Sequence, residues 1–288
     1  MVATLADGPR PVTLPGLIHE VRPWELYGTP YRDLYRVMGR NDGRPRLVAY
    51  GQNAEDVVLM RAFADRRNGF FVDVGAGEPV RGSLTKNLVD RLGWHGVNIE
   101  PLPERFERLR RERPGDVNLR AAVDTRPGTA TFYRVIPGGQ PPDMLGLSTL
   151  EPEIAGEHDR DGADVEELEV TVVTLESVLA SHAKPGFDLL KVDVEGREAA
   201  VLASADLAFW QPRVVVAEAT VPGSPEPNHQ TWEPSLLAAG YALALFDGLN
   251  RFYARDDEPE LLARLSVPAN VWDRWIPWAC ARRAGLEP

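Results

Sequence analysis

The sequence contains a single cysteine, Cys280, and no hydrophobic run of the length that crosses a membrane. One cysteine cannot form an internal disulfide, and disulfides are rare in reducing compartments, so we expect a cytoplasmic protein. A transmembrane helix needs about 20 consecutive apolar residues, and no stretch approaches that length. Residues 1–10 lack a basic region followed by an apolar core, which argues against a secretory signal.

Basic residues are also few: 32 Lys and Arg stand against 43 Asp and Glu, which gives a net charge of −11. This charge disfavours a nucleic-acid backbone as the main partner, and we expect a small-molecule substrate instead, with a homo-oligomer left open. Residues 151–169 hold nine acidic residues and one basic residue, Arg160. We interpret this stretch as a solvated helix and loop.

Apolar runs of strand length alternate with helical patterns over most of the chain. This alternation predicts an α/β fold with a mostly parallel sheet covered by helices on both faces. A pair of strands about Asp247–Gly248 adds a terminal antiparallel hairpin. We divide the chain into a proline-rich N-terminal arm (1–48, with one short helix at 31–38), a compact domain (49–256) and a C-terminal helical tail rich in Trp (257–288).

One strand–turn–helix–strand unit covers residues 70–100. Its first strand contains Asp73 and ends in a turn with Gly75 and Gly77, and its second strand ends in Glu100. Such a turn lets a nucleoside-bearing ligand approach the backbone, and the acid is suited to hold ribose hydroxyls. A dinucleotide fingerprint would need a third glycine at position 80, which is Val80. The turn therefore favours a cofactor without a pyrophosphate.

Acidic residues also follow other predicted strands. Asp124 ends a strand expected at 117–123, where it or a nearby backbone amide could receive an adenine amino group. Asp193 and Glu218 end two later strands that we expect to be neighbours in the sheet. Paired carboxylates of this kind raise each other's pKa or attract Mg²⁺ or Mn²⁺. The alternative is that Lys191 forms a structural ion pair with Asp193 or Glu195.

Histidines offer one candidate for a general base. His229 lies in the loop after Glu218, although a lone loop histidine is more often simply exposed. Glu195 is the other candidate, because it follows the same buried strand as Asp193. The residues themselves leave open which of the two would take a proton.

Six segments in order resemble the FkbM family of S-adenosylmethionine (SAM)-dependent methyltransferases. They are Gly51-Gln-Asn-Ala-Glu-Asp-Val-Val-Leu, Phe71-Val-Asp-Val-Gly-Ala-Gly, Asn98-Ile-Glu-Pro, Gly146-Leu-Ser-Thr-Leu, Leu190-Lys-Val-Asp-Val-Glu-Gly and Val216-Ala-Glu-Ala-Thr. The resemblance spans about residues 50–255. It implies a Rossmann-like class I methyltransferase fold with a seven-stranded sheet. It also implies methylation of hydroxyl groups, commonly on sugars or natural products.

The resemblance further implies roles for individual residues. SAM would be bound by a set of seven: Gln52, Asp73, Gly75, Gly77, Ser83, Glu100 and Asp124. Related sugar methyltransferases hold a divalent metal with acids at the positions of Asp193 and Glu218, but their histidine base has no counterpart beside Asp193. The catalytic candidates are therefore Asp193, Glu195, Glu218 and His229.

We accordingly predict a SAM-dependent O-methyltransferase that acts on a sugar or a glycosylated natural product, with Mg²⁺ or Mn²⁺ as an optional assistant. Two rival hypotheses are an NAD(P)-dependent oxidoreductase on a similar sheet and a non-catalytic binding domain that keeps the fold. Val80 counts against the first rival. The costly acids at the ends of buried strands count against the second.

Overall fold

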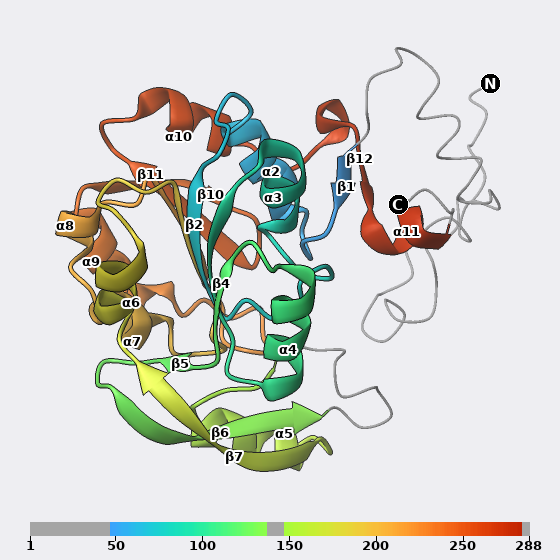
Figure 1. Cartoon of the computed structure of the whole chain (residues 1–288), viewed down its shortest axis with the longest axis vertical. Coiled ribbons are helices and arrows are strands. Elements are labelled where there is room, and N and C mark those ends of the chain that lie inside the picture. The colour runs from blue at the N-terminus through green and yellow to red at the C-terminus, as the bar shows by residue number, and fades with distance from the viewer. Residues whose placement is uncertain (1–46, 137–146, 284–288) are drawn as a thin grey trace, which may run out of the picture. The chain divides into compact units, whose positions relative to one another are not determined.

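The computed structural model describes residues 47–136 and 147–283. Most of the predicted N-terminal arm, with its predicted helix at 31–38, and residues 137–146 lie outside the described residues. The contacts divide the chain into two units. One is Leu47–Pro277, and the other joins residues 1–46 to residues 278–288. Of the second unit, the structure describes only α11 (Trp278–Arg283). The first unit contains all the candidate site residues and is shown in Figure 1.

A seven-stranded sheet forms the centre of the unit, in the order β10–β11–β9–β8–β2–β3–β4. Strands β4, β3, β2, β8 and β9 are parallel, whereas β11 is antiparallel to both of its neighbours. This confirms the predicted fold class, including the terminal hairpin. The bounds are β2 (Phe70–Val74), β3 (His95–Ile99), β4 (Val117–Leu119), β8 (Leu189–Val192), β9 (Val214–Glu218), β10 (Tyr241–Phe246) and β11 (Asn250–Arg255).

Helices cover both faces of this sheet, as expected because the central strands β2, β3, β8 and β9 are almost wholly buried. One apolar cluster joins one face to α2 (Glu55–Ala62), α3 (Lys86–Leu92) and α10 (Pro259–Leu265). A second cluster joins the other face to α6 (Leu175–His182), α7 (Glu198–Ala203), α8 (Leu207–Trp210) and α9 (Glu233–Ala238). Helix α4 (Pro103–Glu112) packs beside β4. None of the helices in the described ranges has the length and apolarity needed to span a bilayer.

A second, three-stranded sheet lies apart from the large one, in the order β5–β7–β6 (Figure 1). It consists of β5 (Ala122–Val123), β6 (Gly128–Ile136) and β7 (Asp164–Val173), with α5 (Pro152–Arg160) packed against β6 and β7. The prediction of one strand over 117–123 was wrong, because the chain leaves the large sheet after Leu119 and enters the small one at Ala122.

The acidic stretch at 151–169 was also only partly predicted. Its first half is α5, but the strand expected at 168–173 begins earlier, so residues 164–167 belong to β7 and not to a loop. Pairing with β6 along nine residue pairs stabilises this strand, and most of its acidic side chains face solvent. Glu166 forms an ion pair with Arg134 of the partner strand, at 3.0 Å.

The compact unit closes with a short parallel pair of strands, β1 (Leu47–Ala49) and β12 (Trp275–Pro277). Before β12, α10 packs on α2 and the β10–β11 hairpin, so residues 259–277 contribute to the same body as the central sheet. Arg61 on α2 forms an ion pair with Asp273 at 2.7 Å and donates a hydrogen bond to the carbonyl of Val267. Two turns of 3₁₀ helix, His229–Thr231 and Val271–Asp273, complete the unit.

Candidate active site

The glycine turn after β2 packs directly on the chain that follows β8. Gly75 has φ 74°, a conformation that side chains other than glycine rarely adopt. A Cβ atom at Gly75 would lie 1.8 Å from the carbonyl oxygen of Asp193. The amides of Gly75 and Ala76 both donate to the Ile99 carbonyl, at 3.0 Å. The turn that was predicted to hold the cofactor therefore touches the segment that carries the candidate catalytic acids.

Glu100 lies at the end of β3 and is 3% exposed. Its Oε2 accepts a hydrogen bond from the Gly77 amide and its Oε1 accepts one from the Leu102 amide, both at 2.9 Å. Burial raises the pKa of this carboxyl. Each carboxylate oxygen can accept more than one hydrogen bond, so Glu100 keeps capacity for ribose hydroxyls while its orientation is fixed by the backbone.

Lys191 connects the glycine turn to Asp193. It lies opposite Asp73 in the β2–β8 register. Its Nζ lies 2.5 Å from the Gly75 carbonyl oxygen, 3.1 Å from Asp73 Oδ1 and 3.4 Å from Asp193 Oδ2. Burial lowers the pKa of Lys191, but Asp73 and Asp193 outweigh it, so the pKa is raised and the ammonium stays charged. Lys191 thus pairs with Asp73 as well as with Asp193, a partner that the sequence interpretation did not include.

Two more of the predicted cofactor residues lie in loops beside the glycine turn. Ser83 is buried, and its Oγ accepts a hydrogen bond from Arg113 Nη2 at 3.0 Å. Gln52 is exposed on the loop before α2. The two loops meet where the Gly82 amide donates to the Tyr50 carbonyl at 2.9 Å. Arg113, which reaches Ser83 from the end of α4, was not identified from the sequence.

Asp124 does not end a strand of the large sheet, contrary to the prediction, because it follows β5 of the small sheet. Its Oδ2 accepts a hydrogen bond from Arg197 Nη2, and its Oδ1 accepts one from the Thr125 amide at 2.6 Å. Burial opposes ionisation, but these hydrogen bonds outweigh it and lower the pKa of Asp124. The carboxylate is therefore already engaged within the chain.

The structure brings Asp193, Glu195 and Glu218 together. One carboxylate oxygen from each lies within 4.8 Å of those from the other two. Burial and then the neighbouring Asp193 raise the pKa values of both glutamates, that of Glu218 to about 11. Glu218 Oε2 is buried and has no hydrogen-bond partner among the described residues. A buried acceptor without a donor is costly, and either a cation or a hydroxyl could supply what it lacks.

Glu195 occupies this cluster in an unusual backbone conformation. Its φ is 54°, in the left-handed region, and the following Gly196 has φ 103°. The turn is held by Glu198, whose Oε1 accepts hydrogen bonds from the Val194 and Gly196 amides at 3.1 and 3.2 Å. Left-handed residues other than glycine persist where the surroundings enforce them, and they are frequent at functional sites.

His229 lies on the 3₁₀ turn before α9. Its Nε2 is 3.8 Å from Glu233 Oε2, and its ring packs edge-on against Trp232. Glu233 in turn accepts hydrogen bonds from Arg251 and Tyr253. These contacts place His229 in a network with α9 and β11.

A second group of polar residues lies next to the acid cluster. Asn250 is directly opposite Glu218 in the β9–β11 register. Its Nδ2 donates to Glu55 Oε1 at 2.8 Å, and the Asn53 amide donates to Glu55 Oε2 at 2.9 Å. Glu55 is 1% exposed, and burial, with a smaller contribution from Asp247, raises its pKa to about 8. Glu55 therefore joins the loop before α2 to the terminal hairpin.

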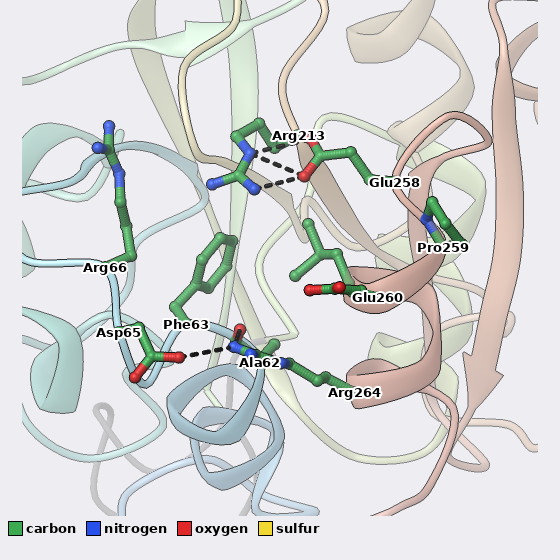
Figure 2. Close-up of a pocket in the computed structure, with 10 residues that line it drawn as sticks. Ala62, Phe63, Asp65, Arg66, Arg213, Glu258, Pro259, Glu260 and Arg264 are labelled. Carbon is green, nitrogen blue, oxygen red and sulfur yellow. Dashed lines mark hydrogen bonds and ion pairs between the residues drawn. The ribbon is translucent and has the colours of Figure 1, made fainter.

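A pocket of about 520 Å³ lies at the opposite edge of the large sheet, where β9 begins. Figure 2 shows Arg213 paired with Glu258 above the Phe63 ring, and Asp65 bonded to Arg264. Arg213 also lies 3.5 Å from the buried Asp188. Arginines and acids are both present in its wall, and the ion pairs connect α10 to the amino ends of the central strands.

A family model named Methyltransferase FkbM domain matches residues 73–243, which is more than half of the chain. The chain belongs to the FkbM methyltransferase family. No curated protein matches it. Among solved structures, the chain is similar to a TehB-like SAM-dependent methyltransferase from Corynebacterium glutamicum, with 12% identity, a TM-score of 0.37, and coverage of 80% of this chain and 97% of that one.

The family match confirms the resemblance drawn from the sequence, and with it SAM-dependent methyl transfer. The matched range includes the glycine turn, Glu100 and the acid cluster. Three residues around the Glu195 turn were not identified from the sequence. Thr149 and Glu198 form hydrogen bonds with residues 194–196, and Arg197 pairs with Asp124 and Glu151. Thr149 could have been noticed, since it lies in the segment Gly146-Leu-Ser-Thr-Leu that resembles the family.

Proposed function

We propose that this FkbM methyltransferase transfers the methyl group of SAM to a hydroxyl group of a sugar or a glycosylated natural product. The observation that supports the acceptor class is the set of buried oxygens at the carboxyl edge of the sheet that lack a donor. Glu218 Oε2 and Asp247 Oδ2 are both buried without a hydrogen-bond partner among the described residues. A polyhydroxylated acceptor brings several donors that such oxygens can accept.

On the donor side, Glu100 and Gly77 would hold the ribose, with Glu100 fixed by two backbone amides. Asp73, Gly75, Ser83 and Gln52 would border the rest of the cofactor. Asp124 would contribute less than the sequence suggested, because Arg197 already occupies its Oδ2. An adenine amino group could still reach the backbone near Ala122.

The acid cluster fits a divalent cation. Asp193 and Glu218 would be ligands, with Glu195 close enough to be a third. Mg²⁺ and Mn²⁺ prefer carboxylate oxygens, and the orphaned Glu218 Oε2 marks a place where a positive charge is favourable. When bound, such an ion would lower the pKa of a coordinated alcohol and stabilise the charge that develops on its oxygen.

The residues of the chain would provide alignment and proton transfer. The sulfonium methyl is already electrophilic, so most of the rate enhancement comes from placing the acceptor oxygen in line with it. The Lys191 ammonium contacts both the Gly75 carbonyl oxygen and the Asp193 carboxylate. It would therefore fix the distance between the cofactor turn and the acids that face the acceptor. Of the two candidate bases, Glu195 lies in the acid cluster and His229 contacts α9, which favours Glu195.

The test is to incubate the protein with SAM and a panel of glycosides and to detect a mass gain of one methylene. Calorimetric titration should give binding of S-adenosylhomocysteine and none of NADH.

Asp193→Asn should abolish turnover with little change in S-adenosylhomocysteine affinity. Exhaustive chelation with EDTA should remove activity, and Mn²⁺ should restore it; unchanged activity would remove the cation from the proposal. Methylation of a nitrogen or carbon acceptor alone would overturn the acceptor class.

A further inference from the structure

Thr149, which lies between β6 and α5, forms a hydrogen bond with the turn that contains Glu195. Thr149 is fully buried, and its Oγ1 donates a hydrogen bond to the Glu195 carbonyl at 2.8 Å. The same Oγ1 accepts a hydrogen bond from the Glu151 amide at 3.0 Å. The hydroxyl thus connects the start of α5 to the backbone of Glu195.

Thr149 is itself rigidly placed. Its backbone pairs with Tyr133 of β6 through two hydrogen bonds, at 2.8 and 3.0 Å. Tyr133 belongs to the long β6–β7 pair, which forms the body of the small sheet. A rigid support of this kind can hold a strained turn that would otherwise relax.

Two further contacts reach the same turn from the α5 side. Arg197 pairs with Glu151 at 2.9 Å. A Cβ atom at Gly196 would lie 2.5 Å from Ile154 Cδ1, so α5 packs tightly against the turn. Residues 195–197 therefore contact Thr149 and α5 on one side. On the other side, Glu198 accepts hydrogen bonds from the Val194 and Gly196 amides.

We propose that Thr149 is a positioning residue for methyl transfer, and that its hydroxyl holds Glu195 in the left-handed conformation that directs the carboxylate to Asp193 and Glu218. This proposal rests on the function proposed above and extends it to a residue that touches neither cofactor nor acceptor. In this proposal the small sheet also contributes to the site, because its strand β6 holds Thr149 in position to bind the Glu195 carbonyl.

Three variants separate positioning from simple loss of stability. Thr149→Val keeps the size and branching of the side chain but removes the hydroxyl. Thr149→Ser keeps the hydroxyl. Ser148→Ala is the matched control, because Ser148 is also buried and its Oγ also accepts one backbone hydrogen bond, from Val135 at 3.2 Å. Among the described residues it forms no hydrogen bond to residues 193–198.

Because displacement of a catalytic group by about 1 Å can cost 100-fold in rate, we expect Thr149→Val to lower kcat by roughly 10- to 100-fold. The acceptor KM and the Kd for S-adenosylhomocysteine should stay within about twofold. Thr149→Ser should restore most of kcat, and Ser148→Ala should resemble the wild type. A folded Thr149→Val with wild-type kcat would overturn the proposal, as would an equal loss in Ser148→Ala. If the valine variant does not fold, Thr149→Ala replaces it.

Hydrogen exchange supplies a readout that does not depend on activity. The Val194 and Gly196 amides donate hydrogen bonds to Glu198 Oε1, which should slow their exchange as long as the turn keeps this conformation. Thr149→Val should speed their exchange about tenfold or more, and Ser148→Ala should not. If the wild type transfers no methyl group to any acceptor, the proposed function fails, yet the exchange result still decides whether Thr149 holds the turn. Unchanged exchange would show that it does not.

Discussion

Glu55 gives the most quantitative prediction, because its side chain is buried and contains a titratable group. The carboxyl is 1% exposed, and burial raises its pKa from 4.5 to about 8. In the folded protein it is therefore neutral over a pH range in which the unfolded chain would ionise it. Its contribution to stability is fully present below pH 4.5 and is lost as the pH rises through 8.

The size of the effect follows from the shift. Each pKa unit corresponds to about 1.4 kcal/mol, so between pH 5 and pH 8 Glu55 alone should reduce the free energy of unfolding by about 3 kcal/mol. Glu55→Gln removes the ionisation. It retains an acceptor for Asn250 Nδ2 or for the Asn53 amide, which Glu55 now binds at 2.8 and 2.9 Å. The variant should therefore be less sensitive to alkaline pH than the wild type.

The assay is urea unfolding of both proteins at half-unit pH steps from 5 to 8. The relevant quantity is the difference in unfolding free energy between wild type and variant, because other buried acids titrate equally in both. Glu153→Gln, an exposed position on α5, serves as the control and should show a constant difference. A wild-type minus Glu55→Gln difference that stays constant across this range would refute the assignment of a raised pKa to Glu55.

Two further predictions follow from contacts away from the acid cluster. Asp188→Asn should lower the free energy of unfolding by about 2 kcal/mol, because Asp188 is buried whereas its partners Arg66 and Arg213 are partly exposed. The folded fraction of this variant should transfer methyl groups at the wild-type rate, and a lower kcat would contradict this prediction. Gly75→Ala should abolish either folding or the binding of S-adenosylhomocysteine, because the Cβ atom of the alanine would overlap the Asp193 carbonyl oxygen. A calorimetric affinity for S-adenosylhomocysteine close to that of the wild type would contradict the described turn.

The parts of the fold that the sequence predicted are those with strong local patterns. Phe70–Val74 is a continuous apolar run and forms β2 with the expected bounds. The Asp247–Gly248 turn lies between β10 and β11, as predicted. Apolar residues at helical spacing from Val57 to Ala64 predict a helix with Asn53 as its N-cap. That helix is α2, but it begins after Ala54, which is in a left-handed conformation, and it has no side-chain cap.

The features that the sequence did not predict depend on distant partners. Val117 to Val123 has apolar residues at both ends and no glycine or proline between them, and only the tertiary pairing shows that Leu119 and Ala122 belong to different sheets. The acidic residues at 164–167 hide the start of β7, of which only 168–173 was predicted, because pairing with β6 extends the strand beyond its buried Val170 and Val172. Strands β1 and β12 are three residues long, which is too short for a recognisable hydrophobic pattern, and each is stabilised by pairing with the other.

The same distinction applies to the candidate site. Asp73, Glu100, Asp193 and Glu218 could be selected because acids at the ends of buried strands are unusual, whatever their partners. The partners could not be selected in this way. Arg113, Thr149 and Arg197 are ordinary residues in their local context, and their importance comes from hydrogen bonds to segments 28 to 73 residues away in the chain.

The pairing of β1 with β12 has a consequence for the order in which this unit is completed during synthesis. Leu47–Ala49 finds its strand partner only in Trp275–Pro277, so β1 leaves the ribosome long before β12 exists. The central sheet can form in the meantime, whereas β1 and the apolar cluster of Ala49, Ala54 and Val57 must wait for the last strand. Nascent chains arrested before residue 275 should therefore hold a formed sheet but an open edge at α2, detectable as protease cleavage near residue 50.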